Sequence, residues 1–367
     1  MKLLFCPLTY NMKMRKNYWL LFIMISISSC KGQDHTAPIK SKESDTVLAF
    51  TSTLNLVKID TIHIDNAPFG IVRTITQDKA GNIWFATFEG IFKYDGNSFT
   101  NISKEVSQAR FFSVLEDSKN NLWFGTIGEG LYYYNGESFR NFTTDDGLLN
   151  NEIVCIYEDR AGNIWLGTNG GMSMYDGKNF QNYVIVGDTI VKDNKGTIIP
   201  NLQRPINEVN AIIEDKTGKF WFGTRGSMFT YDRNSFTTVR HIGKPFNNVR
   251  SIIKDKKGNI WWGGNDGFWH YDYVTLTNYE KRFTGYIHED TEGNIWTSSA
   301  DGFTWSLSRY DLTDSHEVSK TATEIKSGEG MFFGIHEDSK GNIWSGTLDG
   351  VCRYEEGMFT YFSSLTN

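Results

Sequence analysis

Seven histidines are the first side chains in this sequence that could do acid–base chemistry, since imidazole transfers protons near neutral pH. His288 and His336 each precede a Glu-Asp pair, which makes them candidates for a proton-transfer pair. Packing between sheets is the favoured interpretation, because other copies of a repeat described below carry Thr, Leu, Tyr or Ile at this position. The sequence contains no His-Glu-x-x-His, Cys-x-x-Cys, nucleophile elbow or phosphate-binding glycine loop. We therefore predict no catalytic residue, no metal ion and no cofactor.

Arginines and aromatic rings indicate a ligand-binding site instead. Arg73, Asn210 and Arg250 occupy one position of the repeat, where packing does not require polar side chains. The other copies carry at this position Phe112, Val154, Gly285 and Phe333. Three rings are candidate stacking surfaces: Trp269, His270 and Trp305. Ring stacking combined with bidentate arginine contacts holds sugars and acidic groups.

A third pattern lies in the turns between the second and third strands of each copy. One residue in each turn is polar or charged, and five of the seven are acids: Glu89, Glu129, Asn169, Arg225, Asp266, Asp301 and Asp349. The acids would form a rim around a channel mouth, suited to cationic groups or sugar hydroxyls; alternatively, Asp-Gly and Glu-Gly only form the hairpin turns. The longest connections lie on this face, where we expect the ligand. The predicted ligand-binding residues are Arg73, Asn210, Arg250, Arg225, Asp266, Trp269, His270, Asp301, Trp305 and Asp349.

These side chains belong to a sequence unit that recurs seven times. Each copy has an Asp followed by an anchor Trp, as in Asp159 and Trp165. The anchor tryptophans are Trp84, Trp123, Trp165, Trp221, Trp261, Trp296 and Trp344. Their spacings of 39, 42, 56, 40, 35 and 48 residues average about 43, which is the period of four-stranded propeller blades rather than of helical repeats.

Alternation of apolar and polar residues indicates four strands in each copy. In the third copy they are Val154–Glu158, Ile164–Gly167, Met172–Tyr175 and Phe180–Tyr183. The Asp-x-x-Gly-Asn turns resemble part of a calcium loop but lack its alternating carboxylates and final Glu, so we interpret them as hairpin turns. One such sheet cannot cover both of its faces, whereas seven arranged radially can. We predict an all-β fold, a seven-bladed β-propeller of four-stranded antiparallel blades, with a solenoid as the alternative.

The third copy closely resembles the two-component regulator propeller repeat. The match runs over residues 143–176, in the Thr-Thr-Asp-Asp-Gly-Leu start, the Gly-Asn-Ile-Trp-Leu-Gly-Thr core and the final Tyr-Asp, and the resemblance covers about residues 66–362. It implies a sensor role, since such repeats usually form the periplasmic sensor of hybrid histidine kinases, often in polysaccharide-using Bacteroidetes. The sequence ends at Asn367 without a kinase, so we expect no kinase output of its own. Streptogramin lyases are similar propellers, which keeps a lyase or hydrolase as the alternative function.

Two segments depart from the repeat. Residues 185–206 and about 312–330 are predicted insertions between the outer strand of one copy and the inner strand of the next. The closure of the ring has two candidates. Met358–Phe362 supplies a fourth strand to the last blade, and Asn55–Ile64 also has the pattern of a strand.

The first thirty residues have the features of a secretory signal. A basic stretch at 13–16 precedes an apolar run at 18–27, shorter than the roughly 20 residues that span a bilayer as a helix. The run ends in Ser28-Ser29-Cys30, which resembles the lipobox of bacterial lipoproteins; an ordinary secreted protein is the alternative. We predict a lipoprotein signal peptide at 1–29, a lipidated Cys30 with a flexible tether at 30–53, and the propeller at 54–367.

Composition and charge limit the partners. The chain has 54 aromatic residues and 35 glycines, which suits a large β-sheet core. Without residues 1–29, 33 Lys and Arg stand against 43 Asp and Glu, a net charge of −10, so we expect no nucleic-acid partner. Cys155 and Cys352 occupy different repeat positions, so we expect no disulfide between them. We predict an outer-membrane or cell-envelope lipoprotein, periplasmic or surface-exposed, that binds a glycan, peptide or protein; a scaffold without a small ligand is a further alternative.

Overall fold

The computed structural model describes residues 57–193, 195–200, 207–312 and 318–364. They belong to one compact unit, Asn55–Asn367. The predicted signal peptide, Cys30 and the tether lie outside the described residues. Among those that are described, no helix has the length and apolar character needed to cross a membrane, and the helical element is one 3-10 turn at Thr144–Asp146.

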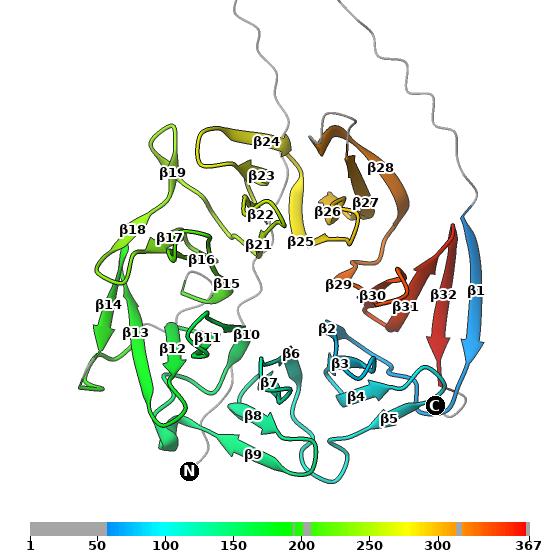
Figure 1. Cartoon of the computed structure of the whole chain (residues 1–367), viewed down its shortest axis with the longest axis horizontal. Helices are drawn as coiled ribbons and strands as arrows, with labels where there is room; N and C mark the ends of the chain where they lie inside the picture. The colour runs from blue at the N-terminus through cyan, green and yellow to red at the C-terminus, as the bar shows by residue number, and fades with distance from the viewer. Residues whose placement is uncertain (1–56, 194, 201–206, 313–317, 365–367) are drawn as a thin grey trace, which may run out of the picture. The chain divides into compact units, whose positions relative to one another are not determined.

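Seven sheets, each with four consecutive antiparallel strands, form the blades in chain order (Figure 1). The first three are β2 (Val72–Gln77), β3 (Ile83–Thr87), β4 (Gly90–Tyr94) and β5 (Phe99–Asn101); β6 (Phe111–Glu116), β7 (Leu122–Thr126), β8 (Leu131–Tyr134) and β9 (Phe139–Phe142); and β10 (Ile153–Glu158), β11 (Ile164–Thr168), β12 (Gly171–Tyr175), β13 (Phe180–Val186) and β14 (Thr189–Asp193). The next two are β15 (Val209–Glu214), β16 (Phe220–Thr224), β17 (Met228–Tyr231) and β18 (Phe236–Thr238); and β21 (Ser251–Lys254), β22 (Ile260–Gly264), β23 (Gly267–Tyr271) and β24 (Leu276–Glu280). The last two are β25 (Phe283–Glu289), β26 (Ile295–Asp301), β27 (Thr304–Leu312) and β28 (Val318–Gly328); and β29 (Phe333–Glu337), β30 (Ile343–Thr347), β31 (Gly350–Glu355) and β32 (Met358–Ser363).

The first strand of each blade is the inner strand, and these strands contact one another in a closed ring. β2 contacts β6, each following inner strand contacts the next, and β29 returns to contact β2. The predicted seven-bladed propeller of mostly four-stranded antiparallel blades is therefore confirmed. The closed ring also excludes the solenoid alternative.

The anchor tryptophans fill the spaces between blades, as the repeat predicts. Trp165 in blade 3 is 3% exposed, and its ring lies 4.7 Å from Phe220 and 5.8 Å from Phe222 of blade 4. Gly167, two residues later, is required by close packing, because a Cβ there would lie 2.2 Å from the carbonyl oxygen of Val209 in the next inner strand. The Trp-x-Gly spacing thus brings neighbouring blades into direct backbone contact.

The ring closes with a strand from the N-terminal side of the propeller. β1 (Lys58–His63) lies outside β32 in blade 7 and pairs with it in parallel, from Lys58 opposite Met358 to His63 opposite Ser363. Figure 1 shows this blue strand beside the red one. Both candidate closure segments therefore join blade 7, which has five strands.

One predicted insertion is wrong and another connection was not predicted. Most of residues 312–330 form β28, the fourth strand of blade 6, because the hairpin of β27 and β28 is longer than in other copies. Residues 185–206 do begin with an addition, since β14 extends blade 3 by a fifth strand. Between blades 4 and 5 lies a further hairpin, β19 (Arg240–His241) with β20 (Lys244–Pro245), which the sequence pattern did not indicate.

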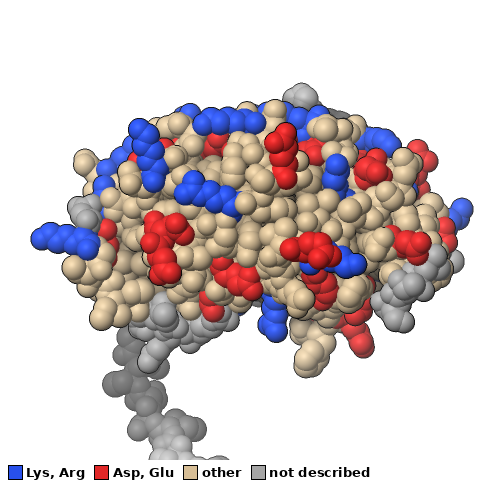
Figure 2. Space-filling view, turned by 90° about the horizontal axis from the view of Figure 1, so that it is seen from below, with Lys and Arg blue, Asp and Glu red and all other residues tan. Residues whose placement is uncertain are grey.

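The flank of the propeller carries charges of both signs. Figure 2 shows acidic and basic side chains interspersed over one side of the molecule, with Lys and Arg more frequent along the upper edge. This distribution is that of an ordinary solvated surface rather than of a single charged patch.

Candidate functional site

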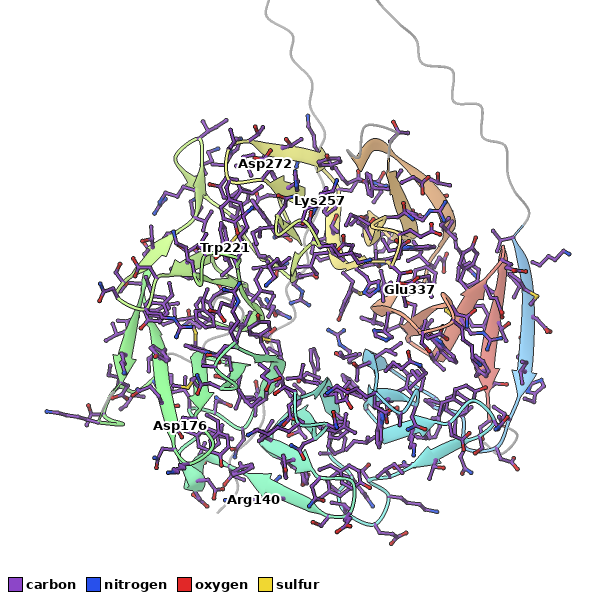
Figure 3. The ribbon with its side chains drawn as sticks, viewed as in Figure 1. Arg140, Asp176, Trp221, Lys257, Asp272 and Glu337 are labelled. Atoms are coloured by element: carbon purple, nitrogen blue, oxygen red, sulfur yellow. The ribbon has the colours of Figure 1, made fainter. Side chains whose placement is uncertain are left out.

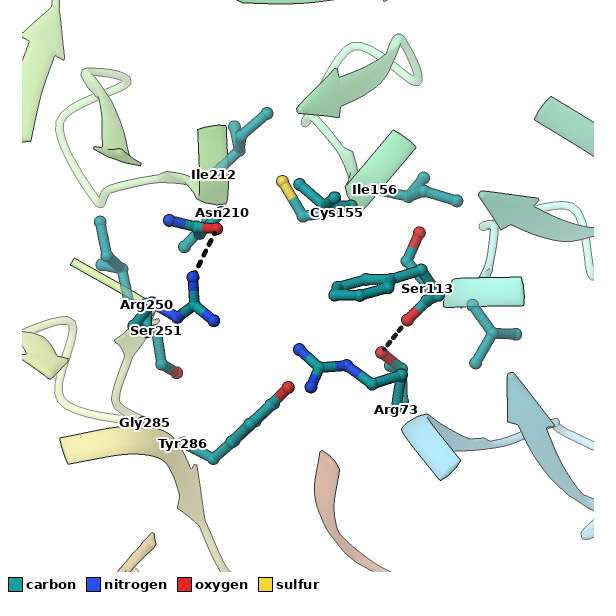
Figure 4. A pocket seen from close by; sticks show the side chains of 16 residues that line it. Arg73, Ser113, Cys155, Ile156, Asn210, Ile212, Arg250, Ser251, Gly285 and Tyr286 are labelled. Atoms are coloured by element: carbon teal, nitrogen blue, oxygen red, sulfur yellow. Dashed lines mark hydrogen bonds between the residues drawn. The ribbon is translucent and has the colours of Figure 1, made fainter. Parts of the chain in front are cut away.

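A cavity of about 200 Å³ lies where the beginnings of the inner strands converge. Six blades contribute to its wall, and the residues at the predicted repeat position that line it are Arg73, Phe112, Val154, Asn210, Arg250 and Gly285. The structure therefore brings Arg73, Asn210 and Arg250 together in one cavity, as their shared repeat position indicates. Figure 4 shows the two guanidinium groups reaching toward the same space from opposite sides.

Arg73 is held between aromatic rings of the neighbouring blades. Its guanidinium carbon lies 4.1 Å from the ring centroid of Phe112 and 4.5 Å from that of Phe333. Tyr286 extends toward the same guanidinium (Figure 4), at 5.9 Å from its ring centroid. These contacts fix the side chain through cation–π attraction but leave its positive charge in place. The Nε atom is buried without a hydrogen-bond partner.

Arg250 is held by two long polar contacts. Its Nη1 donates to Oδ1 of Asn210 at 3.4 Å and lies 3.7 Å from Oε1 of Glu208. That oxygen also accepts a shorter bond, 3.0 Å, from Nε of Arg225. Asn210 is fixed in turn, because its Nδ2 donates to the carbonyl oxygen of Val249 at 3.2 Å. The carboxylate is therefore shared and its closer contact is with Arg225.

The result is an excess of positive charge. Arg225 and Arg250 share one buried carboxylate, that of Glu208, and Arg73 has no ion-pair partner among the described residues. Burial lowers the pKa of Arg250, the charges of Arg225 and Arg73 act in the same direction, and Tyr286 and Glu208 act against them. Like charges brought together away from water repel more strongly than in solvent. The cavity can therefore attract an anion.

Cys155 also lines the cavity, on β10. Its Sγ lies 3.4 Å from the carbonyl oxygen of Val209, to which the thiol donates, and burial raises its pKa to about 12. A thiol with this pKa is protonated at neutral pH and is not a nucleophile. Cys155 and Cys352 are both free thiols, as we expected.

Comparison with known proteins identifies the repeat. The model of the two component regulator propeller family matches residues 66–89, 105–128, 147–170 and 203–226. The chain carries two component regulator propeller repeats. A histidine kinase of Formosa agariphila, named histidine kinase P4, is 27% identical over 180 residues, which are 40% of this chain and 12% of that kinase. The chain thus matches only a small part of that relative.

Several solved structures share the propeller fold. The extracellular domain of a protein named as a hybrid two component system of B. thetaiotaomicron aligns with a TM-score of 0.59 and 22% identity, over 78% of this chain and 39% of that one. A catalytically inactive virginiamycin B lyase from Staphylococcus aureus, solved with quinupristin, aligns at 0.59 and 14%, over 80% and 97%. YCF48 bound to D1 peptide aligns at 0.54 and 14%, over 82% and 99%. At these identities the likeness shows the fold alone.

The predicted stacking rings lie in the blades of the propeller rather than on the cavity wall. Trp269 packs against Phe246 at 5.3 Å and against His241 of the extra hairpin at 4.8 Å. His270 lies on the other side of β23, 4.1 Å from the ring of Trp261, and burial lowers its pKa. Trp305, on β27, contacts the ring of Phe283 at 5.8 Å.

The charged turn residues also lie outside the cavity lining. Asp266 is exposed, and its Oδ2 accepts a 2.6 Å bond from the backbone N–H of Asn247. Asp301 and Asp349 are exposed at the turns of blades 6 and 7. Arg225 contributes through Glu208, as described above. Asp266 and Arg225 thus take part in loop structure and charge balance. The contacts of Phe112 and Phe333 with Arg73 and the role of the Glu208 carboxylate were not predicted from the sequence.

The two paired histidines pack between blades 6 and 7. Their ring centroids lie 5.8 Å apart, and Nε2 of His288 accepts a bond from the backbone N–H of Glu337 at 3.2 Å. Burial lowers the pKa of His288 to about 3 and that of His336 to about 4. Both rings are therefore neutral at physiological pH. They are absent from the cavity lining, which supports the packing interpretation.

The Asp-x-x-Gly-Asn turns satisfy their own carboxylates. Oδ2 of Asp159 accepts bonds from Nδ2 of Asn163 at 2.9 Å and from Nε1 of Trp165 at 3.0 Å. Its Oδ1 accepts the backbone N–H groups of Ala161 and Asn163. Among the residues that the structure describes, no group of three His, Cys, Asp or Glu is placed to hold a metal ion. The turns therefore have a structural explanation.

Proposed function

We propose that this chain is a lipid-anchored propeller of the cell envelope that recognises a ligand at its central cavity. The observation that carries the proposal is the convergence of Arg73, Asn210 and Arg250 on one space. A propeller core can be filled by apolar side chains alone, as Val154 shows at the same repeat position. Charged side chains that are half-buried and incompletely paired cost stability, which favours a binding role.

The proposed location rests on the sequence of the first thirty residues and on the relatives. The extracellular domain of a hybrid two component system has this fold, and a histidine kinase contains a similar segment. Those relatives favour an extracytoplasmic sensing role for this propeller. The lipobox-like Ser28-Ser29-Cys30 favours attachment through acyl chains on Cys30, and multiple chains hold a protein stably where one does so marginally.

The cavity chemistry favours recognition over catalysis. None of the described residues that line it is His, Asp or Glu, the side chains that most often act as general acids or bases. The Cys155 thiol stays protonated for the reason given above. The lyases of similar fold therefore support the architecture, and we do not extend their activity to this chain.

Two measurements test the proposal. Cys30→Ala is expected to move the protein from the detergent phase to the aqueous phase in a detergent-partition experiment, since it removes the attachment site. A screen of glycans and peptides against the propeller is expected to yield a ligand whose binding falls when Arg73 or Arg250 is replaced. Peptides are included because YCF48 was solved with one. An unlipidated wild-type protein would refute the lipid anchor. A ligand whose binding is unchanged when either arginine is replaced would refute the cavity as the binding site.

A further inference from the structure

We infer that the central cavity binds an oxyanion, a carboxylate or sulfate group, between Arg73 and Arg250. This inference rests on the proposed function and narrows it to a ligand class. The charge count is the first support. Three arginines and one glutamate leave two positive charges uncompensated by the described residues. An anion placed between the two guanidinium groups would offset their repulsion at close range.

The geometry of the two arginines is the second support. Each guanidinium presents planar N–H donors, and such donors bind carboxylate or sulfate oxygens in pairs. The rings of Phe112 and Phe333 hold Arg73 without using those donors. Arg250 has only long contacts, 3.4 Å to Asn210 and 3.7 Å to Glu208. Both groups therefore retain hydrogen-bonding capacity, and Arg73 is positioned in advance, which lowers the entropy cost of binding.

The size of the cavity limits the ligand. About 200 Å³ is below the roughly 300–1,000 Å³ of pockets for drug-sized molecules. The cavity can hold a small acid, or the acidic group of a longer ligand whose remainder stays at the mouth. Tyr286 extends toward Arg73 (Figure 4), where its hydroxyl can donate to an anion. A neutral sugar ring would leave the two charges unpaired, so we place the acidic group inside.

Acetate, sulfate and glucuronate are the probes that test this inference, with glucose as the neutral control. Thermal unfolding is measured for each probe against potassium chloride at equal ionic strength, so that screening is the same in all samples. A ligand that binds only the folded state raises the melting temperature by an amount that grows with the logarithm of its concentration above Kd. We expect the three oxyanions to stabilise the wild type beyond chloride, and by more than they stabilise Arg73→Met, because sulfate also stabilises folded proteins without binding. Glucose is expected to have no effect.

Variants locate the site. Arg73→Met keeps an apolar chain between the two rings, and Arg250→Gln keeps a polar group beside Asn210. Each is expected to weaken oxyanion binding about tenfold or more, since each removes a charge-assisted pair of bonds. Arg140→Met is the matched control, because Arg140 also lies over a ring, 4.2 Å from Phe142, but at the periphery of the propeller (Figure 3). It is expected to bind within twofold of the wild type.

The outcomes separate this inference from the proposed function. A wild type that gains no stability from any oxyanion beyond chloride overturns the inference, whether or not the variants fold. Equal weakening by Arg140→Met, or none by Arg73→Met and Arg250→Gln, overturns it as well. If a neutral ligand binds and its binding falls when either arginine is replaced, the proposed recognition at the cavity is supported and the oxyanion as its ligand class is refuted. If Arg73→Met unfolds, Arg73→Lys serves in its place, since it keeps the charge and loses the paired donors.

Discussion

The indole nitrogen of Trp165 donates a 3.0 Å hydrogen bond to Oδ2 of Asp159, the first residue of the hairpin turn six positions earlier. The same bond joins the Asp and anchor Trp of every blade, at 2.7–3.0 Å: Trp84 to Asp78, Trp123 to Asp117, Trp221 to Asp215, Trp261 to Asp255, Trp296 to Asp290 and Trp344 to Asp338. The turn therefore orients the ring that fills the space between blades. This coupling explains the fixed Asp-to-Trp spacing of the repeat.

Two substitutions of Trp165 are expected to separate the stability contributed by its buried ring from that contributed by its hydrogen bond. Trp165→Ala removes the ring and the bond, and is expected to cost about 3–5 kcal/mol of unfolding free energy, as for large aromatic residues deleted from cores. Trp165→Phe keeps most of the ring and loses a bond to a charged acceptor, so about 1.5–3 kcal/mol is expected. Urea denaturation measures both. Phe303→Ala, at a side chain that is 94% exposed, should change stability by less than about 0.5 kcal/mol; a loss below that level for Trp165→Ala would contradict the filling role.

The fold could be predicted because the same sequence unit occurs seven times in the chain. A spacing of about 43 residues and four alternating segments determine the blade, and the count of anchor Trp residues determines the number of blades. What varied between copies could not be predicted. Residues 318–328 pair as β28 although they do not resemble the fourth strand of other copies. Parallel pairing of β1 with β32 joins residues 300 positions apart, which a local pattern cannot indicate.

The candidate site was predicted in part for the same reason. Arg73, Asn210 and Arg250 line one cavity because the same repeat position faces it in six of the seven blades. Trp269 and His270 do not reach the cavity, because both lie on a third strand away from the axis, and neighbouring residues of a strand face opposite sides of the sheet. Glu208 precedes its inner strand and meets Arg225 only through the folded turn. Such a pairing has no signal in a single sequence.

Acid is expected to destabilise the propeller through its turn aspartates. Burial alone would raise the pKa of Asp159, but the bonds from Asn163, Trp165 and the turn backbone outweigh it and hold the pKa below the ordinary 3.8. The same shift is found at Asp117, Asp215 and Asp338. A depressed carboxyl pKa stabilises the fold above the unfolded value and the gain is lost as pH falls through the folded value. Stability measured in urea should therefore fall steeply below about pH 4.

The outer turns of the blades give a control for this acid effect. Asp176 and Asp272 lie at the periphery (Figure 3), and backbone hydrogen bonds lower the pKa of each. Asp176→Asn is expected to leave the acid transition nearly unchanged, because an exposed group contributes little. Asp159→Asn should make the transition shallower, since one buried titration is removed. An acid transition of equal slope in both variants would show that the Trp-linked carboxylates do not cause it.

The histidines between blades 6 and 7 are expected to act in a separate pH window. Their folded pKa values, about 3 and about 4, lie below the ordinary 6.5. The unfolded chain therefore binds more protons than the folded chain at pH values between these folded pKa values and 6.5. Stability should therefore fall as pH drops from 6.5 toward 4, by about 1–2 kcal/mol per histidine between pH 7 and pH 5. His336→Leu, which installs the residue found at Leu115, should remove about half of this dependence. A His336→Leu variant whose stability changes with pH as that of the wild type does would contradict this prediction.

Cys155 is expected to resist alkylation although it lines the cavity. Burial raises its pKa and that of Cys352 to about 12, and only the thiolate reacts with iodoacetamide. Mass spectrometry of protein treated at pH 8 should show little modification at either cysteine in the native state and complete modification of both in urea. Because Cys352 is buried between blades and does not line the cavity, it is the internal reference. Rapid labelling of Cys155 alone would show that solvent enters the cavity and that the Cys155 thiol ionises there. That result would contradict the protonated state that excludes this thiol as a nucleophile.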